Sequence, residues 1–260
     1  MTQLRIEVSM DYALAMPGAA ILIIETARTD GQQIIDSDLR FDSFDHFSQV
    51  PGDEGIGHRD VIRAGDGVIC AYRCDVTVTR DDPDLPAMSA QPVEQLSASA
   101  LRYLLPSRYC EAERFQPFVR RRFGHLDGGS KVAAIRDWVE SQIEYVPGSS
   151  HGGTTAADTY LDGQGVCRDY AHLMIAMCRA AQIPARMCSV YAPSVQPPDF
   201  HAVVQVYLDH DWHLVDPSGM AQAREMAVIA VGRDATDIAF LTTETNATLR
   251  SQQVRVTRLD

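Results

Sequence analysis

Three residues in the second half of the chain have the types and the order needed for nucleophilic catalysis by a thiol: Cys167, His201 and Asp216. A thiolate nucleophile needs a neighbouring base, and an imidazole base needs a third group that fixes its orientation. The first two residues are 34 positions apart and the last two are 15 apart. The elements that carry them therefore decide whether they can act as a unit.

Cys167 is expected at the first turn of a helix that begins at residue 166 or 167 and ends near residue 181. Residues 162–165 form a Gly-rich turn before it, and residues 183–185 (Ile-Pro-Ala) end the helical periodicity. A helix N-terminus carries about half a positive charge and unpaired N–H groups, which stabilise a thiolate or an oxyanion. The alternative is an inert buried cysteine, the common state of this residue type.

His201 begins one predicted strand and Asp216 ends the next, so the register of the hairpin decides whether their side chains meet. If Asp209 and His210 form a two-residue turn, the two residues share a face as diagonal neighbours with Cα atoms about 7–8 Å apart. A three-residue turn would place them on opposite faces. The alternative role for Asp216 is to cap the end of its strand.

The remaining cysteines and histidines lie at positions that are less suited to catalysis or metal binding. On the same helix, Cys178 is about 16 Å from Cys167, too far for a disulfide. Cys70 and Cys74 are about 13 Å apart along one strand, too far to share a metal ion. The others are Cys110, Cys188, His151, His172, His210 and His213. Of these, His172 faces away from Cys167 on the helix, and only His151 has a position from which it could line a cleft. The sequence therefore predicts no metal ion and no cofactor.

The composition excludes several classes of protein. The 260 residues carry 23 Lys and Arg against 35 Asp and Glu, a net charge of −12, which argues against binding to nucleic acid or to an anionic membrane surface. Residues 1–12 lack the apolar segment of a signal peptide, and the longest apolar run, residues 19–24, is too short to span a membrane. We expect a cytoplasmic protein with free thiols.

The pattern along the chain predicts two domains with a boundary near residue 92. Residues 1–92 contain short alternating stretches separated by Gly-rich turns, which favours an N-terminal β-sandwich. Residues 81–97 are rich in Pro, Asp and Ser, as linkers often are. Residues 93–260 begin with helices, expected at 93–104 and 130–143, and continue into strands, which predicts an α+β catalytic domain.

Two segments resemble the nucleophile region of the transglutaminase-like superfamily. They are residues 165–172 (GVCRDYAH) and residues 179–186 (RAAQIPAR). The stretches around His201 and Asp216 resemble its His and Asp segments, in the same order. Residues 101–114 and 232–242 resemble its bacterial branch, whose members are described as cysteine proteases and carry an N-terminal β-sandwich.

This resemblance implies a role for each of the three residues. Cys167 would be the nucleophile, His201 the general base and acid, and Asp216 the group that orients the imidazole. It also implies a papain-like core, in which the helix bearing the cysteine packs on an antiparallel sheet. The chain departs from the family at Val190, where a Gly often stands before the Tyr, which changes the local loop shape. It contains no calcium loop, and we expect no metal requirement.

Three functions remain open. The favoured one is a cysteine protease or amidase, which cleaves a peptide or protein amide through an acyl-enzyme thioester that water hydrolyses. In the second, an amine accepts the acyl group, as in a transglutaminase. In the third, the protein is a non-enzymatic binding or assembly protein that keeps the fold. Acyl transfer from a coenzyme A thioester would need a nucleotide-binding feature, and none is found. The sequence predicts neither the substrate nor the oligomeric state.

Overall fold

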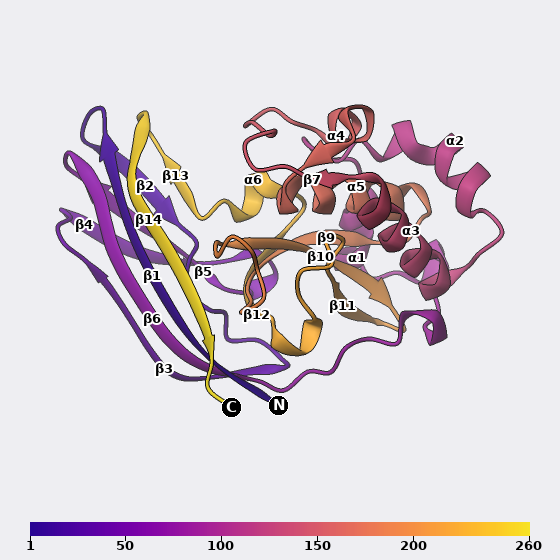
Figure 1. The fold of residues 1–260 in the computed structure, drawn as a ribbon, viewed down its shortest axis with the longest axis horizontal. Helices are drawn as coiled ribbons and strands as arrows, with labels where there is room; N and C mark the ends of the chain where they lie inside the picture. Colours follow the sequence, from indigo (N-terminus) through magenta and orange to yellow (C-terminus); the bar gives the residue numbers. More distant parts are fainter.

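The computed structural model describes residues 1–260 and contains two parts that lie side by side (Figure 1). One part contains the strands β1 (Thr2–Leu14), β2 (Gly18–Leu22), β3 (Gln32–Phe41), β4 (His46–Pro51), β5 (His58–Ala64), β6 (Gly67–Val78), β13 (Leu241–Thr243) and β14 (Ala247–Arg258). They form two four-stranded antiparallel sheets, in the orders β14-β1-β6-β3 and β13-β2-β5-β4. The predicted β-rich N-terminal region is thus confirmed.

The second part is a layer of helices over a third antiparallel sheet (Figure 1). Its sheet has the order β11-β10-β9-β12, with β9 (Ala185–Tyr191), β10 (His201–Leu208), β11 (Asp211–Val215) and β12 (Ala227–Gly232). Its helices are α1 (Ala98–Leu101), α2 (Ala112–Phe123), α3 (Gly128–Gln142), α4 (Ala156–Asp162), α5 (Cys167–Ala180) and α6 (Ala235–Ile238). The short strands β7 (Glu144–Tyr145) and β8 (Gln164–Gly165) pair in parallel beside α5.

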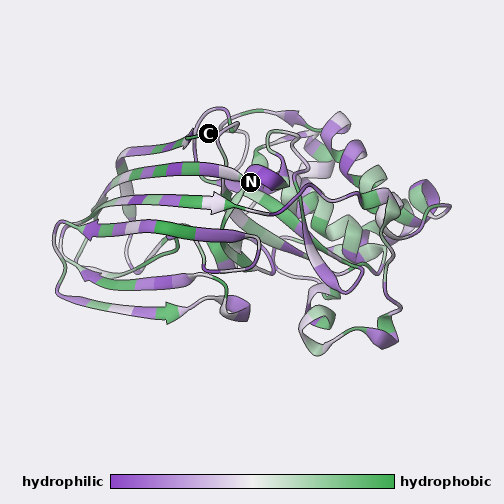
Figure 2. Cartoon of the chain, turned by 90° about the horizontal axis from the view of Figure 1, so that it is seen from below, coloured by the Kyte–Doolittle hydropathy of each residue, from purple (hydrophilic) through white to green (hydrophobic).

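The predicted α+β class and the packing of the cysteine helix on an antiparallel sheet are both confirmed. Helix α5 begins at Cys167 and contacts β9 and β10. Nearly all of its residues are buried, because α2, α3 and α4 cover its other sides. Along the long strands of the first part, by contrast, hydrophobic and hydrophilic residues alternate (Figure 2). This is the pattern of a sheet with one buried face.

The last strands of the chain correct the predicted division into residues 1–92 and 93–260. Strand β14 returns to the first part and pairs with β1, with Val254 opposite Val8, and β13 pairs with β2. In Figure 1 the yellow β14 lies beside the indigo β1. The partner strands are separated by most of the chain, so no local pattern could reveal the pairing. The N-terminal sheets therefore include residues from both ends of the sequence.

The region 93–104 also differs from the single helix that was expected. It contains the 3₁₀ turns Val93–Gln95 and Arg102–Leu104 on either side of the four-residue α1. Ser97 interrupts the helix, since its extended backbone and its side chain, which accepts a hydrogen bond from the Ala100 N–H, begin a new one. The structure contains three further 3₁₀ turns, Asp53–Gly55, Leu85–Ala87 and Ala223–Glu225.

One continuous apolar core joins the two parts. It contains Leu4 and Ile6 of β1 together with Leu173 and Met174 of α5, all of which are fully buried. Tyr191 of β9 adds a polar link, because its hydroxyl donates a hydrogen bond of 2.7 Å to a carbonyl oxygen of the segment after β2. None of the helices has the length and apolar character needed to cross a membrane.

Candidate active site

The hairpin that carries His201 and Asp216 has the register of the two-residue turn, the first of the two alternatives considered above. Residues 208 and 211 lie opposite each other and close a two-residue turn. Both turn residues have positive φ, 47° and 66°, as a type I′ turn requires. His201 and Asp216 therefore share a face, and His201 Nε2 lies 2.8 Å from Asp216 Oδ2.

The Asp216 carboxylate is buried and accepts several hydrogen bonds. Oδ2 accepts from His201 Nε2 and from the Ala221 N–H (2.9 Å), and Oδ1 accepts from the N–H (2.8 Å) and hydroxyl (2.7 Å) of Ser218. Burial acts to raise the pKa of Asp216, but the hydrogen bonds from His201 and Ser218 hold it below its usual range. Asp216 therefore both caps the end of its strand and holds the imidazole, so the two roles considered above coincide.

The His201 ring is almost completely buried, and its second nitrogen, Nδ1, has no hydrogen-bond partner. The Cys167 side chain lies close enough to act on the charge of this ring. Burial acts to lower the pKa of His201, but the hydrogen bond to Asp216 and the proximity of Cys167 outweigh it and raise the pKa to about 10. The imidazole is therefore protonated at neutral pH and places a positive charge near the thiol.

Cys167 is the first residue of α5 and is partly exposed, whereas the other five cysteines are buried. The start of α5 is held by Asp169, whose carboxylate accepts a hydrogen bond of 2.9 Å from the Val166 N–H. A Cβ atom at Gly165 would lie 2.7 Å from the Asp169 Cβ, so this close turn requires glycine. The motif residues around Cys167 thus set the position of the helix terminus.

Tyr145 belongs to this site, although the sequence does not single it out. It lies opposite Gly165 in the parallel pair β7–β8. Burial and the neighbouring Cys167 side chain raise the pKa of Tyr145 to about 12, while a contact with the Cys167 backbone N–H acts in the opposite direction. The phenol thus lies at the N-terminus of α5. A two-residue strand has no periodicity by which it could be recognised.

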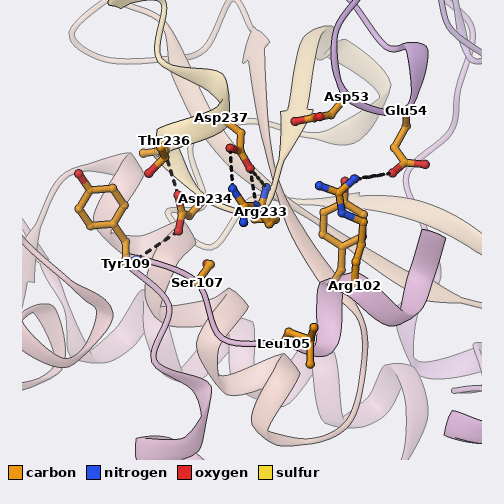
Figure 3. A network of polar contacts seen from close by, with 12 residues as sticks. Asp53, Glu54, Arg102, Leu105, Ser107, Tyr109, Arg233, Asp234, Thr236 and Asp237 are labelled. Carbon is orange, nitrogen blue, oxygen red and sulfur yellow. Dashed lines mark hydrogen bonds and ion pairs between the residues drawn. The ribbon is translucent and has the colours of Figure 1, made fainter. Parts of the chain in front are cut away.

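A second group of polar residues fixes the wall beside Cys167. Asp234 accepts hydrogen bonds from the N–H groups of Tyr109 (3.2 Å) and Thr236 (2.9 Å), as Figure 3 shows. The His172 ring stacks on Tyr109, with centroids 4.9 Å apart, and its Nε2 accepts a hydrogen bond of 3.2 Å from the Ala235 N–H. Burial lowers the pKa of His172 to about 3, so this ring is neutral. His172 therefore supports the wall and does not pair with Cys167, as its helical position predicts.

The other histidines considered above lie outside the cavity that Cys167 lines. His151 is exposed, and its Nδ1 accepts a hydrogen bond from the Gly153 N–H. His210 is exposed in the hairpin turn, and His213 Nε2 contacts the Leu208 carbonyl oxygen. No three His, Cys, Asp or Glu side chains are grouped so that they could hold a metal ion.

Cys167 and His201 line a cavity of about 510 Å³ at the junction of the two parts of the molecule. Its walls come from β9, β10, α6, the start of β13 and the segments around Ile23 and Tyr109. The first part of the molecule therefore contributes directly to this site. The cavity has the size of an ordinary small-ligand or side-chain pocket.

Comparisons with known proteins show the family and the fold of this chain. A profile of the transglutaminase-like superfamily matches residues 117–217. The crystal structure of a protein from Cytophaga hutchinsonii, described as a putative cysteine protease, is 32% identical in sequence and superposes with a TM-score of 0.92, covering 100% of this chain and 91% of that one. An uncharacterised protein of Mycobacterium leprae is 32% identical over 150 residues. That match spans only about half of each chain, 53% of both.

Proposed function

This chain belongs to the transglutaminase-like superfamily, and from that premise we propose that it is a thiol enzyme that cleaves peptide or protein amides, with Cys167, His201 and Asp216 as its catalytic triad. The observation that carries the proposal is the setting of His201. One ring nitrogen is bonded to a buried carboxylate, and the other is left free beside a partly exposed thiol at a helix N-terminus.

In the proposed reaction, the Cys167 thiolate attacks the carbonyl carbon of the amide. The developing oxyanion lies at the N-terminus of α5, where backbone N–H groups and the helix dipole stabilise negative charge. Protonated His201 then gives its proton to the leaving nitrogen, the C–N bond breaks, and a thioester remains on Cys167. Asp216 stabilises the imidazolium and keeps the ring in place.

Water attacks the thioester in the second half of the reaction. His201, now neutral, accepts the proton of this water, and the collapse of the intermediate releases the acid and regenerates the thiolate. The same groups would serve transfer to an amine. The resemblance to a protein described as a cysteine protease favours hydrolysis.

Alkylation of Cys167 by iodoacetamide tests this assignment through its dependence on pH. An ordinary thiol, with a pKa of about 8.5, loses roughly 100-fold in rate between pH 8.5 and pH 6 because its thiolate disappears. We expect the rate at Cys167 to fall less than about tenfold, because protonated His201 lies beside the sulfur. Peptide mass spectrometry of the alkylated protein measures the rate.

The control for this experiment is a second buried histidine. His201→Gln should restore the ordinary loss of about 100-fold, whereas His172→Gln should leave the profile unchanged, because the His172 ring is neutral. A wild-type rate that falls as steeply as that of His201→Gln would contradict the proposal. Preferential labelling alone would not support it, since the other five cysteines are buried and would be slow for that reason.

Tyr145 is the side chain that we propose as a second donor to the oxyanion, because its hydroxyl lies at the N-terminus of α5. Tyr145→Phe should lower kcat by about 100-fold, the usual effect of losing one such donor. Alkylation by iodoacetamide forms no oxyanion, so its rate should stay near the wild-type value. The two measurements together separate oxyanion stabilisation from thiolate reactivity.

Tyr170→Phe is the matched control for this variant. The Tyr170 ring is 5.9 Å from that of Tyr145, but its hydroxyl bonds to the Ile143 carbonyl oxygen instead of lying at Cys167. We expect it to retain most of the kcat of the wild type. Equal losses in the two variants would assign Tyr145 a purely structural role.

A further inference from the structure

The segment between α6 and β13 supplies one wall of the cavity beside Cys167. Phe240 lies in this segment, and its carbonyl oxygen accepts a hydrogen bond of 3.0 Å from the Ile23 N–H. The next residue, Leu241, pairs with Leu22 of β2. The N-terminal sheets therefore hold this wall through backbone hydrogen bonds, so its position does not depend on side-chain packing alone.

Two phenylalanine rings form the apolar surface of this wall. Phe200 and Phe240 stack with centroids 4.6 Å apart and an angle of 6° between their planes. Tyr191 supports Phe200 from behind, at 5.6 Å. Both phenylalanines are only half-buried and line the cavity. The remaining apolar lining consists of Ile23, Met187, Ala202, Ala235, Ile238, Ala239 and Leu241.

The cavity offers little charge to a ligand. Arg168 lines it, but its guanidinium already bonds to Asp169, Ser150 and the His151 carbonyl oxygen. Asp199 accepts a hydrogen bond of 2.8 Å from Gln252, which reduces its availability. The one unpaired cation, Arg108, is exposed and lies over the Tyr109 ring.

Ser189 is one of the uncharged polar residues that line this largely apolar cavity, together with Thr236 and Thr242. It lies on β9 opposite Ala202, the residue that follows His201 in the sequence, and its exposed fraction is 8%. Ser189 belongs to the lining of the cavity, and its hydroxyl is buried with no hydrogen-bond partner. The surface that the cavity offers to a ligand is therefore mainly that of its apolar side chains.

We propose that the cavity binds a large apolar side chain, preferably aromatic, on the acyl side of the amide that Cys167 attacks. The side chain packs against Phe200 and Phe240. This assignment rests on the proposed thiol chemistry at Cys167 and names the substrate class for it. It also gives the N-terminal sheets a function, since they position one wall of the specificity pocket.

Alkylation of Cys167 by N-acetylated chloromethyl ketones of phenylalanine, glycine and aspartate tests the proposal. In each reaction the sulfur displaces chloride, so the three reagents differ only in the side chain that would enter the cavity. We expect the phenylalanine reagent to react at least about tenfold faster than the other two, the discrimination typical of an apolar pocket. Mass spectrometry at Cys167 gives the three rates, and iodoacetamide gives the intrinsic reactivity.

Variants of the cavity link the preference to its walls. Phe240→Ala should reduce the ratio of phenylalanine to glycine rates about tenfold, and Ala239→Phe should slow the phenylalanine reagent selectively by filling the space. Phe44→Ala, an exposed aromatic residue of the N-terminal part that does not line the cavity, should change neither rate. Phe44→Ala should also keep the wild-type iodoacetamide rate, and in every variant the ratio of the phenylalanine to the glycine rate corrects for any change in the reactivity of the thiol.

Several outcomes would overturn the assignment. The first is an equal rate for the three reagents. The second is a faster reaction of the aspartate reagent, which would point to Arg108 as the selecting group. The third is no reaction with any chloromethyl ketone while iodoacetamide still labels Cys167. The proposed thiol chemistry would survive all three. Conversely, a phenylalanine preference together with an iodoacetamide rate that is independent of His201 would leave the pocket intact and refute the chemistry.

Discussion

Replacing Cys167 by alanine is expected to reduce amide hydrolysis by at least about 10⁴-fold, to the level of a protein without a nucleophile. Losing the nucleophile of a triad removes covalent catalysis altogether and leaves only binding and oxyanion stabilisation. Release of aminomethylcoumarin from a set of peptidyl coumarin amides measures the activity. Because Cys167 is partly exposed, the free energy of unfolding should change by less than about 1 kcal/mol.

Cys178→Ala is the control for this loss. Cys178 lies on the same helix but is fully buried, so its removal should lower the stability while retaining most of the activity. Hydrolysis that persists in Cys167→Ala would show that another group is the nucleophile. If the wild type hydrolyses none of the substrates and the alanine variant keeps the cellular effect of the protein, the binding or assembly function considered above would be favoured instead.

Replacing Asp216 by asparagine is expected to lower kcat by about 10⁴-fold, as the corresponding change does in other triads. Both carboxylate oxygens accept hydrogen bonds, and an amide can offer only one oxygen. Its NH₂ group must face either His201 Nε2 and Ala221 N–H or the two donors of Ser218. In the first orientation the imidazole loses the partner that stabilises its charge, and in the second the turn after β11 loses its cap. Steady-state kinetics and denaturant unfolding distinguish these two effects.

Ser218→Ala is the matched control, because it removes one donor from the same carboxylate and leaves the bond to His201 intact. We expect a loss of about 1 kcal/mol in the free energy of unfolding, the usual value for one hydrogen bond, and a kcat within about threefold of the wild type. If both variants lose activity equally, Asp216 would act mainly by holding the turn.

The hairpin of His201 and Asp216 was predictable because register is a local property. A two-residue turn determines which residues face each other, and the period of two along a strand then determines which side chains share a face. The helix after Cys167 was predictable for the same kind of reason, since its apolar spacing and the Gly-rich turn before it are contiguous in the sequence. The candidate triad rests on these two local features, on the order of the three residues and on the resemblance of the segments around them to the transglutaminase-like superfamily.

Other parts of the site depend on contacts between residues far apart in the chain. Strands β13 and β14 pair with strands at the opposite end of the sequence, so the wall formed by Phe240 belongs to a sheet that no local pattern connects to it. Tyr145 reaches the site through a two-residue strand, which is too short to leave a periodic signal. The burial of five cysteines likewise follows from packing and not from their local sequence.

The sequence by itself determined the identities and order of the candidate catalytic residues and the α+β class, and it limited the hairpin register to two alternatives, because turns and amphipathic periods are encoded over a few neighbouring residues. Only the tertiary structure decided that the N-terminal sheets are completed by the C-terminal strands, that the six cysteines divide into one accessible and five buried, and that an apolar cavity lies beside Cys167. Each of these depends on which surfaces exclude water when distant segments pack together.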